Sequence, residues 1–449
     1  MKRFFFTLAL FLILALPGFA AKINIPVEYY KLPNGLKVAI SEDHSSPVVM
    51  VAVYYNTGFR IEPKGQTGFA HLFEHLMFQG SENVAKFEMV KYVEANGGFL
   101  NGHTDFDHTN YYEELAADRV ETALWLEADR MRSLKVTEEN LSNQKDVVME
   151  EVRSNVMNQP YGLFQWIDLW GNANQNWHNS HNGYGDFTDL KAATTQMALD
   201  FYKTYYAPNN AALVVVGDVD TAAVKKMVEK HFTDIPSHEL PKKPDITEPP
   251  QTKENRLQQK DKLAKVPAIA IGYHAAAQNT PDYQALVLLN QILEGDESSR
   301  LFQRLIKDKQ VCLDWSGAVN LGGNDFDYYG PMLLTMYGRY KPNSTADEVV
   351  KNIDEVIADI QKNGVTEKEL ADAKVSFRSA FYDTLESHQS KAHLLAVLAL
   401  FRDDPSLVNR LEEPYVKVTT ADVKAAASKY LVSTNRTVID RVPEQGGTN

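Results

Sequence analysis

Two histidines and a glutamate stand within five positions of the sequence, in His71-Leu-Phe-Glu74-His75. On a helix His71 and His75 lie one turn apart on the same face, separated by about 6 Å along the axis. That spacing lets both imidazoles reach one tetrahedral zinc ion at about 2.0–2.1 Å. Glu74 is turned by about 100° from His75, so it would flank the metal as a base for a water molecule. The segment therefore predicts a zinc site with its own general base.

An ordinary amphipathic helix with its polar residues in solvent is the alternative. Residues 67–79 predict a helix, because they contain no proline and no glycine after Gly68, and Gly80 lies where a C-terminal cap belongs. Apolar residues nearly surround this helix, which predicts that it is buried. They are Leu72, Phe73, Leu76, Met77 and Phe78. Burying two imidazoles and a carboxylate without partners would be unfavourable, and a metal ion removes that difficulty.

A catalytic zinc ion needs a third protein ligand and an open position for water. The best source is the predicted helix within residues 136–160, which carries Glu150 and Glu151 next to each other. Glutamate pairs on helices are usually solvated, and the spacing alone does not decide between them.

The composition limits the class of partner and the kind of metal ligand. The formal net charge is −13, which argues against nucleic acid or an anionic membrane as the main partner. Cys312 is the only cysteine, so no internal disulfide is available and a bound metal must be held mainly by histidines and carboxylates.

Residues 1–20 have the pattern of a secretory signal peptide. Lys2 and Arg3 precede an apolar run over residues 4–16, and Pro17-Gly18 lead to a small-residue end. The run is too short to span a bilayer, which takes about 20 residues. The expected location is the periplasm of a Gram-negative cell or another exported compartment, without a membrane anchor.

The chain is long enough for two domains. Prolines and charges without periodicity predict a linker at 241–258, between an N-terminal domain at 21–240 that carries the zinc motif and a similar C-terminal domain at 259–443. Residues 444–449 are expected to be a disordered tail. Strand-like runs with hairpins, such as the one at Asn34-Gly35, alternate with helical patterns in both halves. The expected fold class is α+β, with two similar domains that each pack helices on a mainly antiparallel sheet.

Several longer segments are shared with one protein family. HLFEHLMFQGS, GGFLNGHT, TNYYEELAADRVETALWLEADRM, VVMEEV and FYKTYYAPNNAALVVVGDVD are together far more specific than the five-residue motif. The chain resembles the pitrilysin (inverzincin) family of zinc metallopeptidases. Within it, the chain is similar to the half-length members, such as mitochondrial processing peptidase subunits and bacterial insulinase-like proteases.

The resemblance implies one zinc ion per chain, held by His71, His75 and Glu151, with Glu74 as general base. It also implies that the strand carrying Asn101 binds the main chain of a substrate, as strand addition to a sheet edge allows. The expected function is that of an exported zinc metalloendopeptidase acting on unstructured peptides.

Two further histidines, His103 and His108, flank a hairpin-like turn. They are expected at the surface, or on the wall of the cleft. Without the resemblance, Asn101 would be interpreted as a turn residue after Gly97-Gly98.

The chain departs from the family pattern in both halves. A glutamate near the metal in relatives is replaced by Gln144, which can hydrogen-bond a ligand but adds no negative charge. An arginine and a tyrosine that contact substrate in relatives align with Ile306 and Leu313, and Arg304 is displaced by two positions. We therefore expect a heterodimer with a homologous chain that supplies the Arg/Tyr pair. A homodimer and a non-catalytic or zinc-binding subunit are the alternatives.

Overall fold

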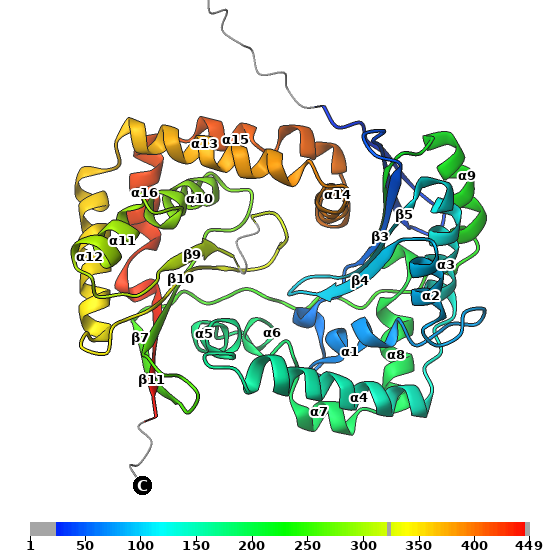
Figure 1. Ribbon diagram of the computed structural model, residues 1–449, viewed down its shortest axis with the longest axis horizontal. Coiled ribbons are helices and arrows are strands. Elements are labelled where there is room, and N and C mark those ends of the chain that lie inside the picture. Colours follow the sequence, from blue (N-terminus) through cyan, green and yellow to red (C-terminus); the bar gives the residue numbers. More distant parts are fainter. Residues whose placement is uncertain (1–23, 321–324, 445–449) are drawn as a thin grey trace, which may run out of the picture.

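The computed structural model describes residues 24–320 and 325–444. Within them it contains two sheets, each packed with helices (Figure 1). The expected signal peptide at 1–20 and residues 445–449 of the expected tail lie outside the described ranges.

The first sheet has the strand order β1-β2-β6-β3-β5-β4. Its pairs are antiparallel except for β2 and β6, which run parallel. The strands are β1 (Glu28–Lys31), β2 (Lys37–Glu42), β3 (Val48–Tyr55), β4 (Phe99–Thr104), β5 (Thr109–Ala116) and β6 (Ala211–Gly217). β4 is therefore an edge strand.

The second sheet has the order β7-β11-β8-β10-β9, with β7 and β11 as its parallel pair. The strands are β7 (Asn255–Asp261), β8 (Ala268–His274), β9 (Ser316–Val319), β10 (Leu333–Arg339) and β11 (Arg436–Pro443). This arrangement repeats β2-β6-β3-β5-β4 of the first sheet, pair by pair. The expected α+β fold with two similar, mainly antiparallel halves is confirmed, although β7 begins inside the segment expected to be a linker.

Helices follow the strands in both halves. The first half contains α1 (Phe69–Leu76), α2 (Glu88–Ala95), α3 (Val120–Arg132), α4 (Glu138–Val152), α5 (Leu169–Ala173), α6 (Trp177–Ser180), α7 (Phe187–Ala192), α8 (Thr195–Tyr205) and α9 (Thr221–Phe232). The second contains α10 (Pro281–Glu294), α11 (Arg300–Phe302), α12 (Ala346–Asn363), α13 (Glu367–Thr384), α14 (His388–Arg402), α15 (Glu413–Lys417) and α16 (Thr420–Tyr430). Over the described ranges, none of these helices has the length and apolar character needed to cross a bilayer.

The central strand β3 is buried on both faces, which explains its nearly continuous apolar sequence VVMVAVYY. Side chains alternate along a strand, so Val51 and Val53 face a core shared with the helices of the first half. Ala52 and Tyr54 face the opposite side and pack in a second core with residues of α14. Figure 1 shows α14 on one side of β3 and the helices α3 and α9 on the other.

The two halves cover each other's sheets reciprocally. α14 of the second half packs on one face of the first sheet. In the same way, α5 of the first half packs on one face of the second sheet. There Leu169 and Trp170 pack against Ala268 and Ala270 of β8. Each sheet therefore depends on the other half for one of its two cores.

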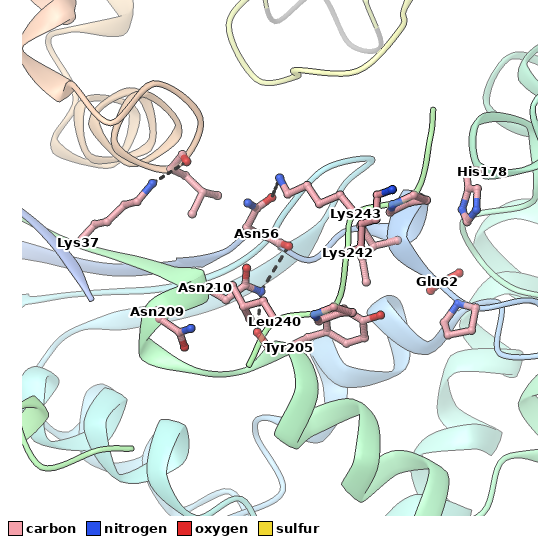
Figure 2. Close-up of a pocket in the computed structure, with 15 residues that line it drawn as sticks. Lys37, Asn56, Glu62, His178, Tyr205, Asn209, Asn210, Leu240, Lys242 and Lys243 are labelled. Atoms are coloured by element: carbon pink, nitrogen blue, oxygen red, sulfur yellow. Dashed lines mark hydrogen bonds between the residues drawn. The ribbon is translucent and has the colours of Figure 1, made fainter. Parts of the chain in front are cut away.

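The segment that connects the halves closes a cavity of about 370 Å³ against the first sheet and α14 (Figure 2). Lys243 of this segment donates to Asn56 Oδ1 at 3.3 Å. Lys37 of β2 donates to the carbonyls of Ala399 and Leu400 at 3.0 and 2.9 Å, near the C-terminal end of α14. The two bonds from Lys37 satisfy helix-end carbonyls. None of the metal-motif residues lines this cavity.

The start of α1 depends on residues outside the helix. Gly68 has φ = +82° and lies against Gly185, where a Cβ atom would come within 2.8 Å of the Gly185 Cα. No N-cap side chain is present. Instead the buried Glu62 carboxylate accepts from Gly68 N–H and Ala70 N–H at 2.9 and 2.8 Å, and His181 Nε2 lies 3.2 Å from it. Glu62 therefore fixes the N-terminal end of the helix that carries the motif.

Replacing Glu62 by Gln should lower the free energy of unfolding by about 2 kcal/mol. The two backbone N–H groups bond to different carboxylate oxygens, and the amide replaces one of these oxygens with an NH2 group that cannot accept. Chemical denaturation followed by circular dichroism measures the change. The matched control is Glu88→Gln, which alters a solvent-exposed bond from Ala85 N–H and should change stability by less than about 0.5 kcal/mol. Equal effects of the two substitutions would contradict this role for Glu62.

Candidate metal centre

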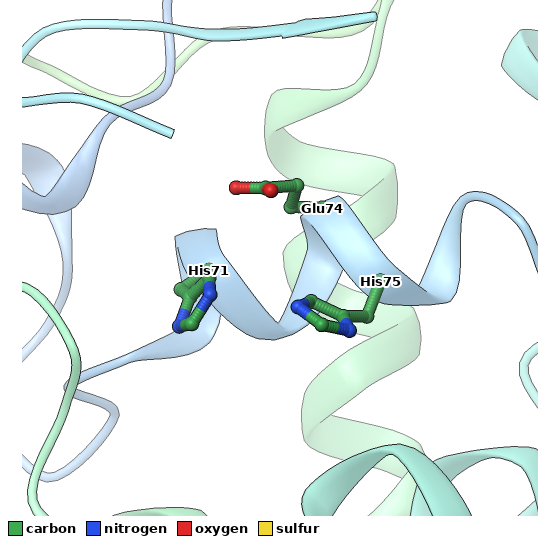
Figure 3. A group of neighbouring side chains, drawn as sticks. All are labelled: His71, Glu74 and His75. Carbon is green, nitrogen blue, oxygen red and sulfur yellow. The ribbon is translucent and has the colours of Figure 1, made fainter. Parts of the chain in front are cut away.

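The three polar residues of the motif project from α1, whose other side chains are buried. Phe69, Leu72, Phe73 and Leu76 are fully buried in the core of the first half, as the sequence predicts for this helix. Figure 3 shows the two imidazoles on one side of the helix and Glu74 on another. One ligand atom from each of the three residues lies within 4.8 Å of the others.

Glu151 of α4 completes the group from a position far along the chain. Its carboxylate oxygens lie 3.9 Å from His71 Nε2 and 3.1 Å from His75 Nε2. Two atoms that are each about 2.1 Å from a tetrahedral metal lie roughly 3.4 Å apart. The separations and the donor set, two imidazoles and a carboxylate, fit a zinc ion.

The packing of α4 distinguishes the two neighbouring glutamates. Thr137 caps α4 by accepting from Asn140 N–H. The buried face of α4 includes Val148 and Val152. Glu151 then faces α1, with 37% of its side chain exposed. Glu150 is 66% exposed and pairs with Arg153. α4 passes into a π-helical turn at Arg153–Met157 instead of continuing as an α-helix toward Pro160.

The environment favours the protonation states that bind metal. Burial lowers the pKa of His71, which favours its neutral imidazole. The hydrogen bond from His75 lowers the pKa of Glu151 below its ordinary value, which favours the carboxylate. Metal ligands must be deprotonated in this way.

A cavity of about 410 Å³ opens beside this group and is walled by both halves of the chain. His71, Glu74 and Glu151 line it together with His103 of β4 and Tyr328 of the second half. No local sequence pattern points to Tyr328, because only long-range packing brings residues of the second half to this cavity. His103 lies where the sequence analysis expects it, exposed and on the wall of this cavity. It follows Asn101 by two positions and so shares one face of β4 with it.

The edge strand β4 runs next to the motif. Asn101 is exposed on β4, and a Cβ atom at Gly102 would lie 3.3 Å from Glu74 Cγ. A second cavity, of about 460 Å³, is lined by His75, Asn101 and Gln144. Its apolar wall includes Phe78, Phe87, Val90, Phe99, Leu100 and Val147.

The remaining predicted positions lie as follows. Gln144 is buried on α4 and donates to Asn143 Oδ1 at 2.8 Å. Ile306 packs against the core of the second half, and 46% of Leu313 is exposed. Arg304 is held by Asn352 at 2.8 Å and by Glu355 on α12.

The sequence-based expectation for His108 is wrong. The sequence pattern predicts a position at the surface or on the cleft wall, yet His108 is completely buried. The turn between β4 and β5 packs against the second half, as the contact between Tyr328 and Asp105 at 3.0 Å shows. Long-range packing of this kind leaves no local sequence pattern.

Comparison with known proteins places both halves of the chain in one family. Residues 37–170 match the model for insulinase (peptidase family M16), and residues 192–376 match the model for the peptidase M16 inactive domain. The zinc protease PqqE of Helicobacter pylori is 27% identical over 417 residues, which cover 92% of each chain. A probable mitochondrial-processing peptidase subunit beta of Arabidopsis thaliana is 26% identical over 264 residues, 58% of this chain and 49% of that one.

The fold is shared over nearly the whole described chain. The crystal structure of a protease from Helicobacter pylori superposes with a TM-score of 0.86 at 26% identity, covering 94% of this chain and 100% of that one. The resemblance seen in the sequence is thereby confirmed. The chain belongs to peptidase family M16, the insulinase family.

Proposed function

We propose that this chain is an exported zinc-dependent metalloendopeptidase that hydrolyses peptide bonds in unstructured peptides, as the catalytic subunit of a dimer. The observation that carries the proposal is the convergence of His71 and His75 with Glu151, which lies 76 positions after His75. Relatives named as zinc proteases support it. Export follows from the signal-peptide pattern of residues 1–20.

His71, His75 and Glu151 would hold the zinc ion, and Glu74 would act as the base. When bound, the ion would supply Lewis-acid polarisation of a water molecule and of the scissile carbonyl. A ligand atom of Glu74 lies within 4.8 Å of one on each imidazole, and Glu74 lines the same cavity as His71 and Glu151. It is therefore placed to accept a proton from the attacking water and to pass it to the leaving amine.

The substrate would add as an extended strand along β4. This strand is the edge of its sheet, so its outer backbone groups are available for pairing. Gly102 has no side chain to separate β4 from Glu74, so a peptide paired there would pass close to the base. Backbone pairing requires an extended peptide, which is why we propose unstructured substrates with Asn101 at the contact.

The cavity beside His75 would receive a substrate side chain. Phe87, Phe99 and Val147 line it and expose 47%, 45% and 41% of their surfaces. Exposed apolar residues that gather around a cavity are typical of a binding site. We infer that the cavity takes an apolar side chain, and that Gln144 forms its polar end.

Glu74→Gln should abolish peptide cleavage while zinc stays bound, because the amide cannot take a proton from water. A positioned base contributes about 10²–10⁴-fold, so the rate of cleavage of a fluorogenic peptide should fall by at least about 10²-fold. Metal analysis of the same sample should show an unchanged zinc content. His71→Ala should instead lose that ion.

The matched control for Glu74→Gln is Glu150→Gln, since Glu150 is exposed and paired with Arg153. This variant should keep both zinc and activity. Normal turnover by Glu74→Gln would refute its assignment as the base.

A second chain would supply the groups that this chain lacks. Ile306 and Leu313 are apolar where relatives carry an arginine and a tyrosine, and Arg304 is held by residues of α12. The inactive-domain match covers this region, and one relative is named as a subunit. We propose a heterodimer with a homologous exported chain that carries the Arg/Tyr pair and lacks the zinc motif.

Purified alone, the chain should cleave peptide at less than about one-tenth of the rate reached with its partner, because removing charged contacts to the reacting groups typically lowers rates by 10-fold or more. Co-expression with a homologous exported chain that carries the Arg/Tyr pair, followed by size-exclusion chromatography and a cleavage assay, tests this. Full activity from this chain alone as a homodimer would exclude the heterodimer. If no combination is active while zinc remains bound, the chain is a non-catalytic subunit, which Gln144 and Leu313 would favour.

A further inference from the structure

A second group of metal-binding side chains lies where the two halves meet. Asp105 and His108 belong to the turn between β4 and β5, and Asp327 belongs to the segment between β9 and β10. One ligand atom from each residue lies within 4.8 Å of the others. His108 is 0% exposed, Asp327 is 6% exposed, and the Asp105 side chain is 12% exposed.

The burial of the His108 imidazole is not explained by hydrogen bonds. Neither of its ring nitrogens has a hydrogen-bond partner within residues 24–320 and 325–444. Its ring lies among those of Tyr54, His393 and Phe401. Burial lowers the pKa of His108, so the neutral ring has a lone pair to offer. Buried polar groups without partners are rare. A metal ion would bind the ring nitrogen of His108 that carries the lone pair.

The two carboxylates are held in the way that metal ligands usually are. Tyr328 OH donates to Asp105 at 3.0 Å. His393 Nε2 bonds to Asp327, while its Nδ1 bonds to Tyr54 OH at 2.7 Å. Hydrogen bonds to the outer side of ligating groups fix their orientation. Since both nitrogens of His393 are engaged, this ring supports Asp327 and is not itself a candidate ligand.

The neighbouring Asp107 belongs to a different interaction. It accepts from Arg60 Nη1 at 2.7 Å and from Tyr329 N–H at 3.1 Å. The Arg60 charge is therefore balanced by Asp107, and it is not directed at Asp105 or Asp327.

We propose that Asp105, His108 and Asp327 bind a second divalent metal ion of the zinc type, which ties the β4–β5 turn to the second half of the chain. One imidazole and two carboxylates suit zinc or manganese. The ion would share these carboxylates with His393, which pairs with Asp327, and with His103, whose Nε2 lies 3.7 Å from Asp105. Asp105 also lines the cavity that contains His71 and Glu74. The ion would therefore fix one wall of that cavity without binding the reacting groups.

The test uses the full chain with the first site emptied by the double substitution His71→Ala and His75→Ala. After dialysis against zinc and then buffer, metal analysis should find one zinc ion per chain. Adding zinc to the metal-free protein should raise Tm by about 3 °C, since an ion that binds only the folded chain stabilises it.

Adding His108→Phe to that variant should bring the zinc content to zero and abolish the Tm response. Phenylalanine fits among the surrounding aromatic rings and has no polar atom to satisfy, so this variant should fold normally by circular dichroism. The matched control is His44→Gln, which changes an exposed histidine beside Asp218 and should leave the second ion bound.

The proposal fails if the double variant retains no zinc and shows no change in Tm, or if folded His108→Phe retains as much zinc. If His108→Phe does not fold, Asp105→Asn takes its place with the same expected loss. A chain in which only the first site fails to bind zinc is distinguishable. Wild type would then bind one zinc ion, and the single variant His108→Phe would bind none.

Discussion

The burial of α1 is the constraint on which the site depends. Phe69 and Phe73 hold one face of the helix in the core, so its polar residues line the cavities next to α4 and β4. An imidazole such as His71, 7% exposed, needs a partner there. α4 brings the Glu151 carboxylate to 3.9 Å from His71 Nε2, because the same packing that buries Val148 turns Glu151 toward α1. Among the described residues His71 Nδ1 has no hydrogen-bond partner. The convergence of these candidate ligands is thus a consequence of how two helices bury their apolar faces.

The reciprocal covering of the two sheets gives this site its second wall. α14 packs on the first sheet and α5 on the second, so the halves cannot separate without exposing a core on each. Tyr328 reaches the cavity of the first half by this route. The Arg60–Asp107 ion pair and the backbone of residues 329–331 reinforce the same junction. The two halves are therefore joined through shared cores, and the cavity beside α1 has walls from both of them.

Sequence patterns predicted the features that are set locally. The spacing of His71, Glu74 and His75 follows from helix geometry alone, and the strand periodicities sufficed for the α+β class. The choice between Glu150 and Glu151 needed the family resemblance, because both lie on one helix and only the packing of α4 separates them. His108 could not be placed correctly, since its burial depends on contacts with residues more than 200 positions away. The interior π-helical turn after Val152 also leaves no simple periodic signal.

The most direct test of the central claim is anomalous diffraction from crystals grown with zinc, with data collected on both sides of the zinc absorption edge. The account predicts a peak about 2.0–2.1 Å from the ring nitrogens of His71 and His75 and from a carboxylate oxygen of Glu151. An ordered site without a peak, or a Glu151 carboxylate turned to solvent while the imidazoles stay in place, would contradict it.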